Sequence, residues 1–156
     1  MTDTTGISRM RYDGVFLKIL QEVENASRFT ESKKFKQHGH TSVFRHSCNV
    51  ALLSSRLASI FRWKVDRPSL LKGALLHDYF LYDWHDKDPA HRWHGLRHPA
   101  VAYANAKRDF ILTPTETDII RHHMFPLTPT PPKSAEAVFV CIADKICAVL
   151  EILRIM

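Results

Sequence analysis

The chain has no long apolar run, and it has few cysteines. No stretch of its 156 residues approaches the roughly 18 consecutive apolar residues that a membrane-spanning helix needs. The N-terminal sequence, MTDTTGISRMRYDG, lacks the apolar centre of a secretory signal. The three cysteines form no CxxC motif, and each lies among apolar residues at helical spacing. We therefore expect a cytoplasmic protein with no membrane contact, whose core thiols are reduced: Cys48, Cys141 and Cys147.

The sequence also lacks strand-like alternation and internal repeats. Apolar side chains instead recur every three or four residues, which is the period of an amphipathic helix. Pro99 is expected in the first turn of its helix, and Thr113-Pro114-Thr115-Glu116 is typical of a capping box. The pattern predicts an all-α, single-domain bundle over residues 1–156, with about six helices. The expected helices are 13–25, 43 to about 63, 68 to 78, 99 to about 108, 113 to 123 and 134 to 153.

Histidine, in contrast, is in excess. The chain has ten histidines, all between residues 38 and 123, and histidine is both the commonest metal ligand and the side chain that titrates near neutral pH. Imidazole and carboxylate groups from several helices can converge on metal ions in the core of a bundle. Candidate ligands fall on successive predicted helices or helix ends, about one helical hairpin apart, and they are His46, His77 with Asp78, His98, His122 or His123, and Asp144.

Asp144 is the most informative candidate, because its predicted helix is apolar nearly all round. A carboxylate in that setting is costly unless it is paired or binds a cation. A simpler explanation exists for each residue alone: Asp144 could pair with Lys145 at the surface, and histidines could complement the dipole at a helix end. Taken together, and with the adjacent His77-Asp78 pair, the pattern favours a metal site.

The ordered set of His46, His77-Asp78 and Asp144 on separate helices resembles the HD-domain superfamily of metal-dependent phosphohydrolases. The resemblance covers about residues 38–151. The segments HDYFLYDWH, HGLRHP, HMFPLTPTPP and ADKICAVLE are together similar to a small bacterial group of HD-domain hydrolases. The chain departs from the cyclic-di-nucleotide branch, which has Gly-Lys where Phe80-Leu81 stand here and a GYP motif that is missing.

The resemblance implies a binuclear centre. It assigns His46, His77, Asp78 and Asp144 to a first metal, with Asp78 bridging to a second that His98 and His123 hold, and His122 as the alternative to His123. Such mixed nitrogen and oxygen ligands suit Mn²⁺, Fe²⁺, Co²⁺, Ni²⁺ or Zn²⁺. One or two of these divalent transition metal ions would support hydrolysis of a small phosphate ester, a nucleotide-like monoester or diester.

Four residues are candidates for the catalytic groups of that reaction. Asp78 would bridge the ions. His94 lies four residues before His98 and could protonate the leaving group or bind a third ion. Arg97 and Lys145 could hold the phosphate, since fixed cations stabilise developing oxyanion charge.

Two other functions stay open. The same six-ligand pattern is similar to that of HD-type di-iron oxygenases, and a non-catalytic metal-binding regulatory module could share the fold. The complete ligand set argues against the second of these.

The net charge of +6 favours an anionic partner. The lysines and arginines are dispersed along the chain and are not interleaved with aromatic residues. We therefore expect a small phosphorylated substrate and not a nucleic-acid polymer. The apolar segment EILRIM at residues 151–156 indicates a buried end or a homodimer contact.

Overall fold

The computed structural model describes residues 12–156 as a set of packed helices with one small hairpin. The α-helices are α1 (Gly14–Ala26), α2 (Val43–Ile60), α3 (Arg67–Leu76), α4 (His94–Asp109), α5 (Pro114–His122) and α6 (Ala135–Ile152). The other elements are the 3-10 helices η1 (Phe29–Lys34) and η2 (Pro89–His91) and the strands β1 (Lys36–His38) and β2 (Thr41–Ser42). The predicted all-α class is confirmed.

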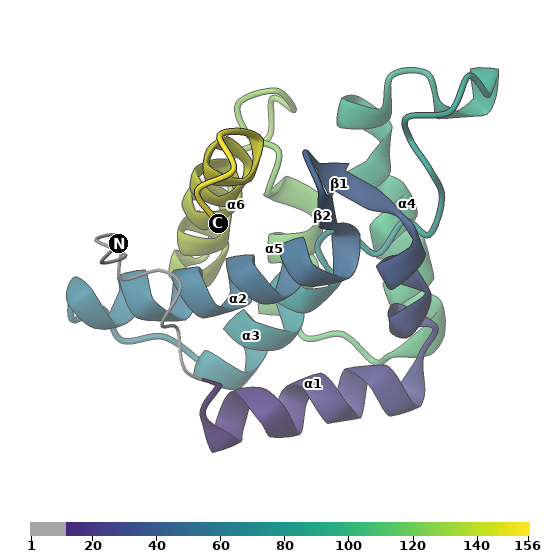
Figure 1. Cartoon of the computed structure of the whole chain (residues 1–156). Helices are drawn as coiled ribbons and strands as arrows, with labels where there is room; N and C mark the ends of the chain where they lie inside the picture. Colours follow the sequence, from purple (N-terminus) through teal and green to yellow (C-terminus); the bar gives the residue numbers. More distant parts are fainter. Residues whose placement is uncertain (1–11) are drawn as a thin grey trace.

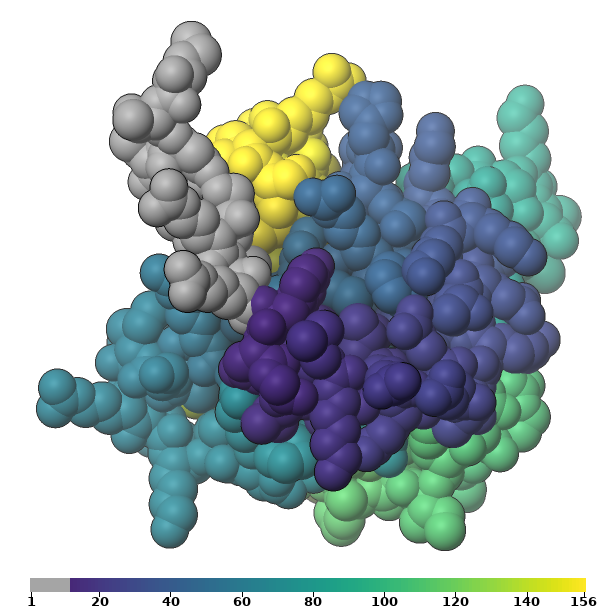
Figure 2. Space-filling model, turned by 60° about the horizontal axis from the view of Figure 1, so that its bottom comes forward, coloured from purple at the N-terminus to yellow at the C-terminus, as the bar shows by residue number. Residues whose placement is uncertain are grey.

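Helix α2 lies at the centre of the bundle. It packs against α6 and α3, and α3 in turn contacts α1 and α5 (Figure 1). Helix α1 lies across the front of the molecule when its lower side is turned forward (Figure 2). Apolar side chains of these five helices form one buried core, which includes Phe16, Val50, Leu70, Leu75, Ile119 and Val140. Helix α3 is buried along most of its length, so the residues that follow it, His77 and Asp78, lie inside the protein.

Helix starts follow the caps that the sequence displays. The side chain at each of four N-caps accepts a hydrogen bond from a backbone N–H in the first turn, and the residues are Asp13, Ser42, Asp66 and Ser134. At α5, Thr113 and Glu116 form the predicted capping box. Because these caps are local, the bounds of α1, α2, α3, α5 and α6 agree with the sequence prediction to within three residues at each end.

Helix α4 corrects the prediction that Pro99 lies in a first turn. The helix begins at His94, and Pro99 lies inside it. The start is set by Trp93, whose backbone is left-handed (φ 60°) and whose side chain makes no capping bond. An aromatic residue rarely adopts this conformation, so the sequence gives no sign of the start. Because of the extra turn, His94 and His98, which are four residues apart in the chain, lie on one face of the same helix.

The hairpin of β1 and β2 corrects the prediction that the chain has no strand. Within residues 12–156, only Lys36–His38 and Thr41–Ser42 form paired strands, and they are antiparallel. Both strands are too short for an alternation of apolar and polar residues to be visible in the sequence. Gly39 makes the turn at φ 57°, and a Cβ atom there would lie 2.9 Å from the backbone oxygen of Glu151. Glycine is therefore required both by the backbone angle and by the approach of α6. The hairpin thereby holds Gln37 and His38 next to the start of α2.

The three cysteines are buried and free, as predicted. Among the helices of residues 12–156, none has the combination of length and apolar character that crossing a bilayer requires. Helix α6 presents apolar side chains to solvent as well as to the core, with Val138, Ile142 and Val149 all at least 40% exposed. Asp144 faces the other way and is buried, which rules out a surface ion pair with Lys145.

Candidate metal centre

Six predicted ligands meet in the interior, brought there by five helices. His46 lies in α2, His98 in α4 and Asp144 in α6. The remaining three follow directly from helix ends, since α3 ends just before His77 and Asp78 and α5 ends just before His123. All six are buried, with exposed fractions between 0% and 8%. Two groups of ligand atoms form among them, and Asp78 belongs to both.

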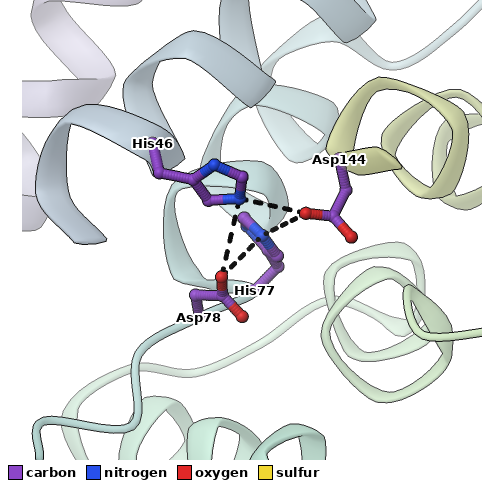
Figure 3. Close-up of side chains that lie close together, drawn as sticks. All are labelled: His46, His77, Asp78 and Asp144. Carbon is purple, nitrogen blue, oxygen red and sulfur yellow. Dashed lines mark hydrogen bonds and ion pairs between the residues drawn. The ribbon is translucent and has the colours of Figure 1, made fainter. Parts of the chain in front are cut away.

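The first group consists of His46, His77, Asp78 and Asp144 (Figure 3). The Nε2 atom of His46 lies 3.0 Å from Oδ1 of Asp144 and 3.6 Å from Oδ2 of Asp78. The Nε2 atom of His77 lies 3.2 Å and 3.5 Å from the same two oxygens. Atoms that each bind one ion at about 2.0 to 2.1 Å are about 3.0 to 3.4 Å apart. The four measured distances, 3.0 to 3.6 Å, lie in or close to this range, so the ligand atoms are spaced for one transition metal ion.

The second group uses the other oxygen of the Asp78 carboxylate. Its Oδ1 atom lies 3.1 Å from Nε2 of His98 and 3.5 Å from Nε2 of His123, and the two Nε2 atoms are 2.8 Å apart. Asp78 thus presents one oxygen to each group, which is how a carboxylate bridges two cations.

Each of the four imidazoles is held through its Nδ1 atom, which leaves Nε2 facing the cluster. The Nδ1 partners of His77, His98 and His123 are backbone oxygens, 2.6 to 2.9 Å away. The Nδ1 partner of His46 is a carboxylate oxygen of Glu151 at 2.9 Å. Because a carbonyl oxygen only accepts, those three imidazoles carry a proton on Nδ1, and Nε2 is the atom that can give a lone pair to a cation. Such outer partners fix the tautomer and orientation that a metal ligand needs.

Charges inside the cluster are balanced by protons when no cation is bound. Burial favours neutral imidazole, but hydrogen bonds to Asp144 and Glu151 outweigh it and raise the pKa of His46 to about 9. Asp78 in the same way raises the pKa of His77 well above its ordinary value. Burial favours the protonated acid at Asp78 and Asp144, yet the facing imidazoles lower the pKa of both carboxyl groups. The site thus keeps its two carboxylates ionised, ready for a cation.

Two buried atoms of the cluster, Nε2 of His77 and Oδ1 of Asp78, make no well-aligned hydrogen bond among the described residues, although atoms of opposite charge lie 3.1 to 3.5 Å away. A buried polar atom without a partner is costly, and such atoms commonly mark the place of an ion or water. Both belong to proposed ligands and both point at a group of other ligand atoms. The residues therefore fit the divalent ions that the sequence led us to expect.

Comparison with family models decides the family. The model that describes the HD domain matches residues 43–149, more than half of the chain. The chain belongs to the HD-domain family. Comparisons with curated proteins and with solved structures returned no match. The family belongs to a superfamily of metal-dependent hydrolases, and the buried cluster of histidines and aspartates in this chain could bind metal.

The paired histidines at the end of α5 contact different neighbours in this HD domain. His123 enters the second ligand group, whereas His122 turns away and its Nδ1 atom lies 2.7 Å from Oδ1 of Asp118. Asp118 also accepts hydrogen bonds from the backbone of Lys133 and Ser134. His122 therefore belongs to a hydrogen-bond network that connects α5 to the start of α6, and it lies outside the metal cluster.

The remaining candidates are His94, Lys145 and Arg97, and they differ in whether they face the cluster. His94 stacks on His98 with ring centroids 4.5 Å apart, and its Nδ1 atom lies 2.9 Å from the Tyr82 hydroxyl. Lys145 lines the same cavity, where its ammonium donates to the backbone oxygens of His123 and Cys141. Arg97 lies on the exposed side of α4 with its guanidinium near the Ala90 oxygen, so it does not face the site.

Sequence reasoning missed two residues that support the cluster. Gln37, on β1, is buried and donates a hydrogen bond of 2.6 Å to Oδ2 of Asp78. Glu151, on α6, holds His46 and accepts a further bond from Asn49. The signal for Glu151 was available, because it lies seven residues, about two helical turns, after Asp144 on the same face. No sequence signal pointed to Gln37, which reaches the site through the hairpin.

We expect Glu151→Gln to weaken metal binding by about 10- to 100-fold, because the loss of an outer carboxylate makes the imidazole a poorer and less oriented ligand. Dissociation constants for Mn²⁺ from calorimetry measure the effect. Glu22→Gln, which removes an exposed carboxylate on α1, is the matched control and should bind like wild type. Equal affinities for the two variants would show that Glu151 does not act on the site.

Proposed function

We propose that this HD domain is a phosphohydrolase that cleaves a small phosphate ester with a binuclear divalent metal centre. The observation that carries the proposal is the Asp78 carboxylate, whose two oxygens face two separate groups of buried ligand atoms. When bound, two such ions would supply Lewis acidity, which lowers the pKa of a water molecule and offsets phosphoryl charge. His46, His77 and Asp144 would hold one ion and His98 and His123 the other, with Asp78 shared.

The chain's own residues then bind and orient the ester. A cavity of about 850 Å³ opens onto Asp78, His98 and Asp144, within the range of small-molecule sites. Lys145 brings a positive charge to it, and its hydrogen bonds to two backbone oxygens hold the ammonium in place. A fixed cation favours an anionic substrate and the charge that develops on its phosphoryl oxygens.

His94 is placed to contact the leaving group. It lines the cavity beside His98, and its Nδ1 atom is engaged by Tyr82. Burial, followed by the charge of His98, lowers the pKa of His94 to about 3. The side chain is then neutral at pH 7 and acts as a hydrogen-bonding imidazole, whose Nε2 atom is left for the ester. This favours an orienting role over proton donation from an imidazolium.

Metal analysis beside a phosphatase assay tests the proposed function. Protein purified without chelator should carry about one to two transition metal ions per chain and release phosphate from members of a panel of nucleotides and sugar phosphates. Chelation should abolish release, and added Mn²⁺ should restore it. Phosphate release that chelation does not change would contradict the proposal. Oxygen consumption with mixed-valence di-iron absorption would instead support the oxygenase alternative.

A further inference from the structure

The cavity above the metal centre has an apolar outer wall. Its apolar lining residues are Trp93 just before α4, Met124, Pro126 and Leu127 in the loop after α5, and Ala148 of α6. Trp93 is 72% exposed and Leu127 is 55% exposed, although both line a concave site. Large apolar side chains that face water inside a pocket are a surface for an apolar ligand group.

This wall is fixed by the backbone. Trp93 adopts a left-handed conformation at φ 60°, which is rare and strained for an aromatic residue. Two residues later, a Cβ atom added to Gly95 would lie 3.0 Å from Cδ2 of Leu127 and 3.9 Å from Cε of Met124. The loop after α5 therefore packs directly on the first turn of α4. The close approach brings the exposed indole and Leu127 to the same opening.

Positive charge in the cavity is limited. Among the lysines and arginines of residues 12–156, only Lys145 lines it. One ammonium beside the metal ligands suits a single phosphoryl group, whereas a triphosphate would bring further charges that no second lysine or arginine of the cavity meets. Polar side chains line other parts of the cavity, namely Gln37, His38, Trp84, His91 and His94. The apolar wall itself offers little to a polar leaving group, since the indole N–H is the sole side-chain donor among Trp93, Met124, Pro126 and Leu127. Polar groups buried against it would lose hydrogen bonds to water.

We propose that the substrate is a phosphomonoester whose alcohol carries a flat, largely apolar group, with the phosphoryl at the Asp78 cluster and the flat group against Trp93 and Leu127. This rests on the proposed phosphohydrolase function and narrows it. Water attacks phosphorus, the bond between phosphorus and the ester oxygen breaks, and that oxygen leaves with a proton as the alcohol. The products are the apolar alcohol and inorganic phosphate.

A matched pair of substrates tests the proposal with the full-length, Mn²⁺-loaded protein. Benzyl phosphate and glycerol 3-phosphate are both monoesters of primary alcohols, so leaving-group acidity contributes little to the comparison. We expect kcat/KM for benzyl phosphate to be at least about tenfold higher, the order of discrimination that a hydrophobic pocket provides. We also expect a nucleoside monophosphate to be a better substrate than the corresponding triphosphate.

Variants of Trp93 and Leu127 test whether the preference for benzyl phosphate comes from the apolar wall. Trp93→Ala and, separately, Leu127→Ala should lower kcat/KM for benzyl phosphate about tenfold and leave that for glycerol 3-phosphate within about twofold. Trp63→Ala removes another exposed tryptophan, one outside the cavity, and should change neither value. Equal hydrolysis of both esters, or a better triphosphate than monophosphate, overturns the inference while the phosphohydrolase function stands. If the metal-loaded protein hydrolyses no ester at all, both proposals fail.

Discussion

Asp78→Asn should lower phosphate-ester hydrolysis by about a thousandfold or more and should remove both metal ions from the chain. The amide keeps the shape of the carboxylate but removes the negative charge that faces both ligand groups. Several kcal/mol of transition-state stabilisation depend on the metal centre, and about 1.4 kcal/mol corresponds to each tenfold change in rate. Elemental analysis and kcat/KM on the best substrate of the panel measure the two effects.

Asp144→Asn separates the bridging role from the loss of a carboxylate in general. Asp144 belongs to the first ligand group alone, so this variant should lose about one ion per chain and keep the other. Glu22→Gln, at the surface of α1, should keep both ions and full activity. Circular dichroism of each variant checks that the helices are intact. Retention of two ions by Asp78→Asn would refute the shared carboxylate.

Metal affinity should rise steeply with pH up to about pH 9. In the metal-free protein the pKa values of His46 and His77 are raised, His46 to about 9, so below that pH a cation must displace their protons. Asp78 and Asp144 have lowered pKa values and are already ionised, so they release none. With two protons displaced, the dissociation constant should fall by about 100-fold per pH unit. Calorimetry in buffers of different ionisation enthalpy counts the protons directly.

The raised pKa of His46 can also be tested in the metal-free protein, through its effect on stability. A group whose pKa is raised on folding stabilises the native state fully below its unfolded pKa, which for histidine is 6.5, and this contribution is lost as the pH passes the folded value. Urea unfolding of the chelated protein should therefore show a contribution from His46 that declines between pH 6.5 and about 9. Metal binding that releases no protons at pH 7 would contradict the assigned charge states.

The sequence predicted the cluster because its members are costly anywhere else. A carboxylate such as Asp144 within an apolar helix, or the His77-Asp78 pair after one, requires a buried partner, and the structure brings these residues together. Helix starts were also predictable where a side chain caps them, as at Thr113. These are local signals, and each can be read from a few neighbouring residues.

The features that the sequence did not predict depend on tertiary contacts. The start of α4 is set by an unusual backbone angle at Trp93, which no propensity indicates. Gln37 reaches Asp78 only because the hairpin closes at Gly39 against α6. Arg97 was expected at the phosphate, but the longer α4 turns it outward, and the choice between His122 and His123 depends on the bond from His122 to Asp118. Side-chain direction around a helix is settled by such neighbours.

The ligands come from five helices, and this has a consequence for the fold itself. His46 and Asp144 are 98 residues apart in the chain, and His98 and His123 are 25 apart. An ion held by such distant residues closes long chain loops, as a disulfide does in a secreted domain. The cysteines here are free, so a filled centre would be the internal cross-link of this domain. It would fasten α4 to the bundle through His98, and loss of the ions would loosen the protein as well as stop its chemistry.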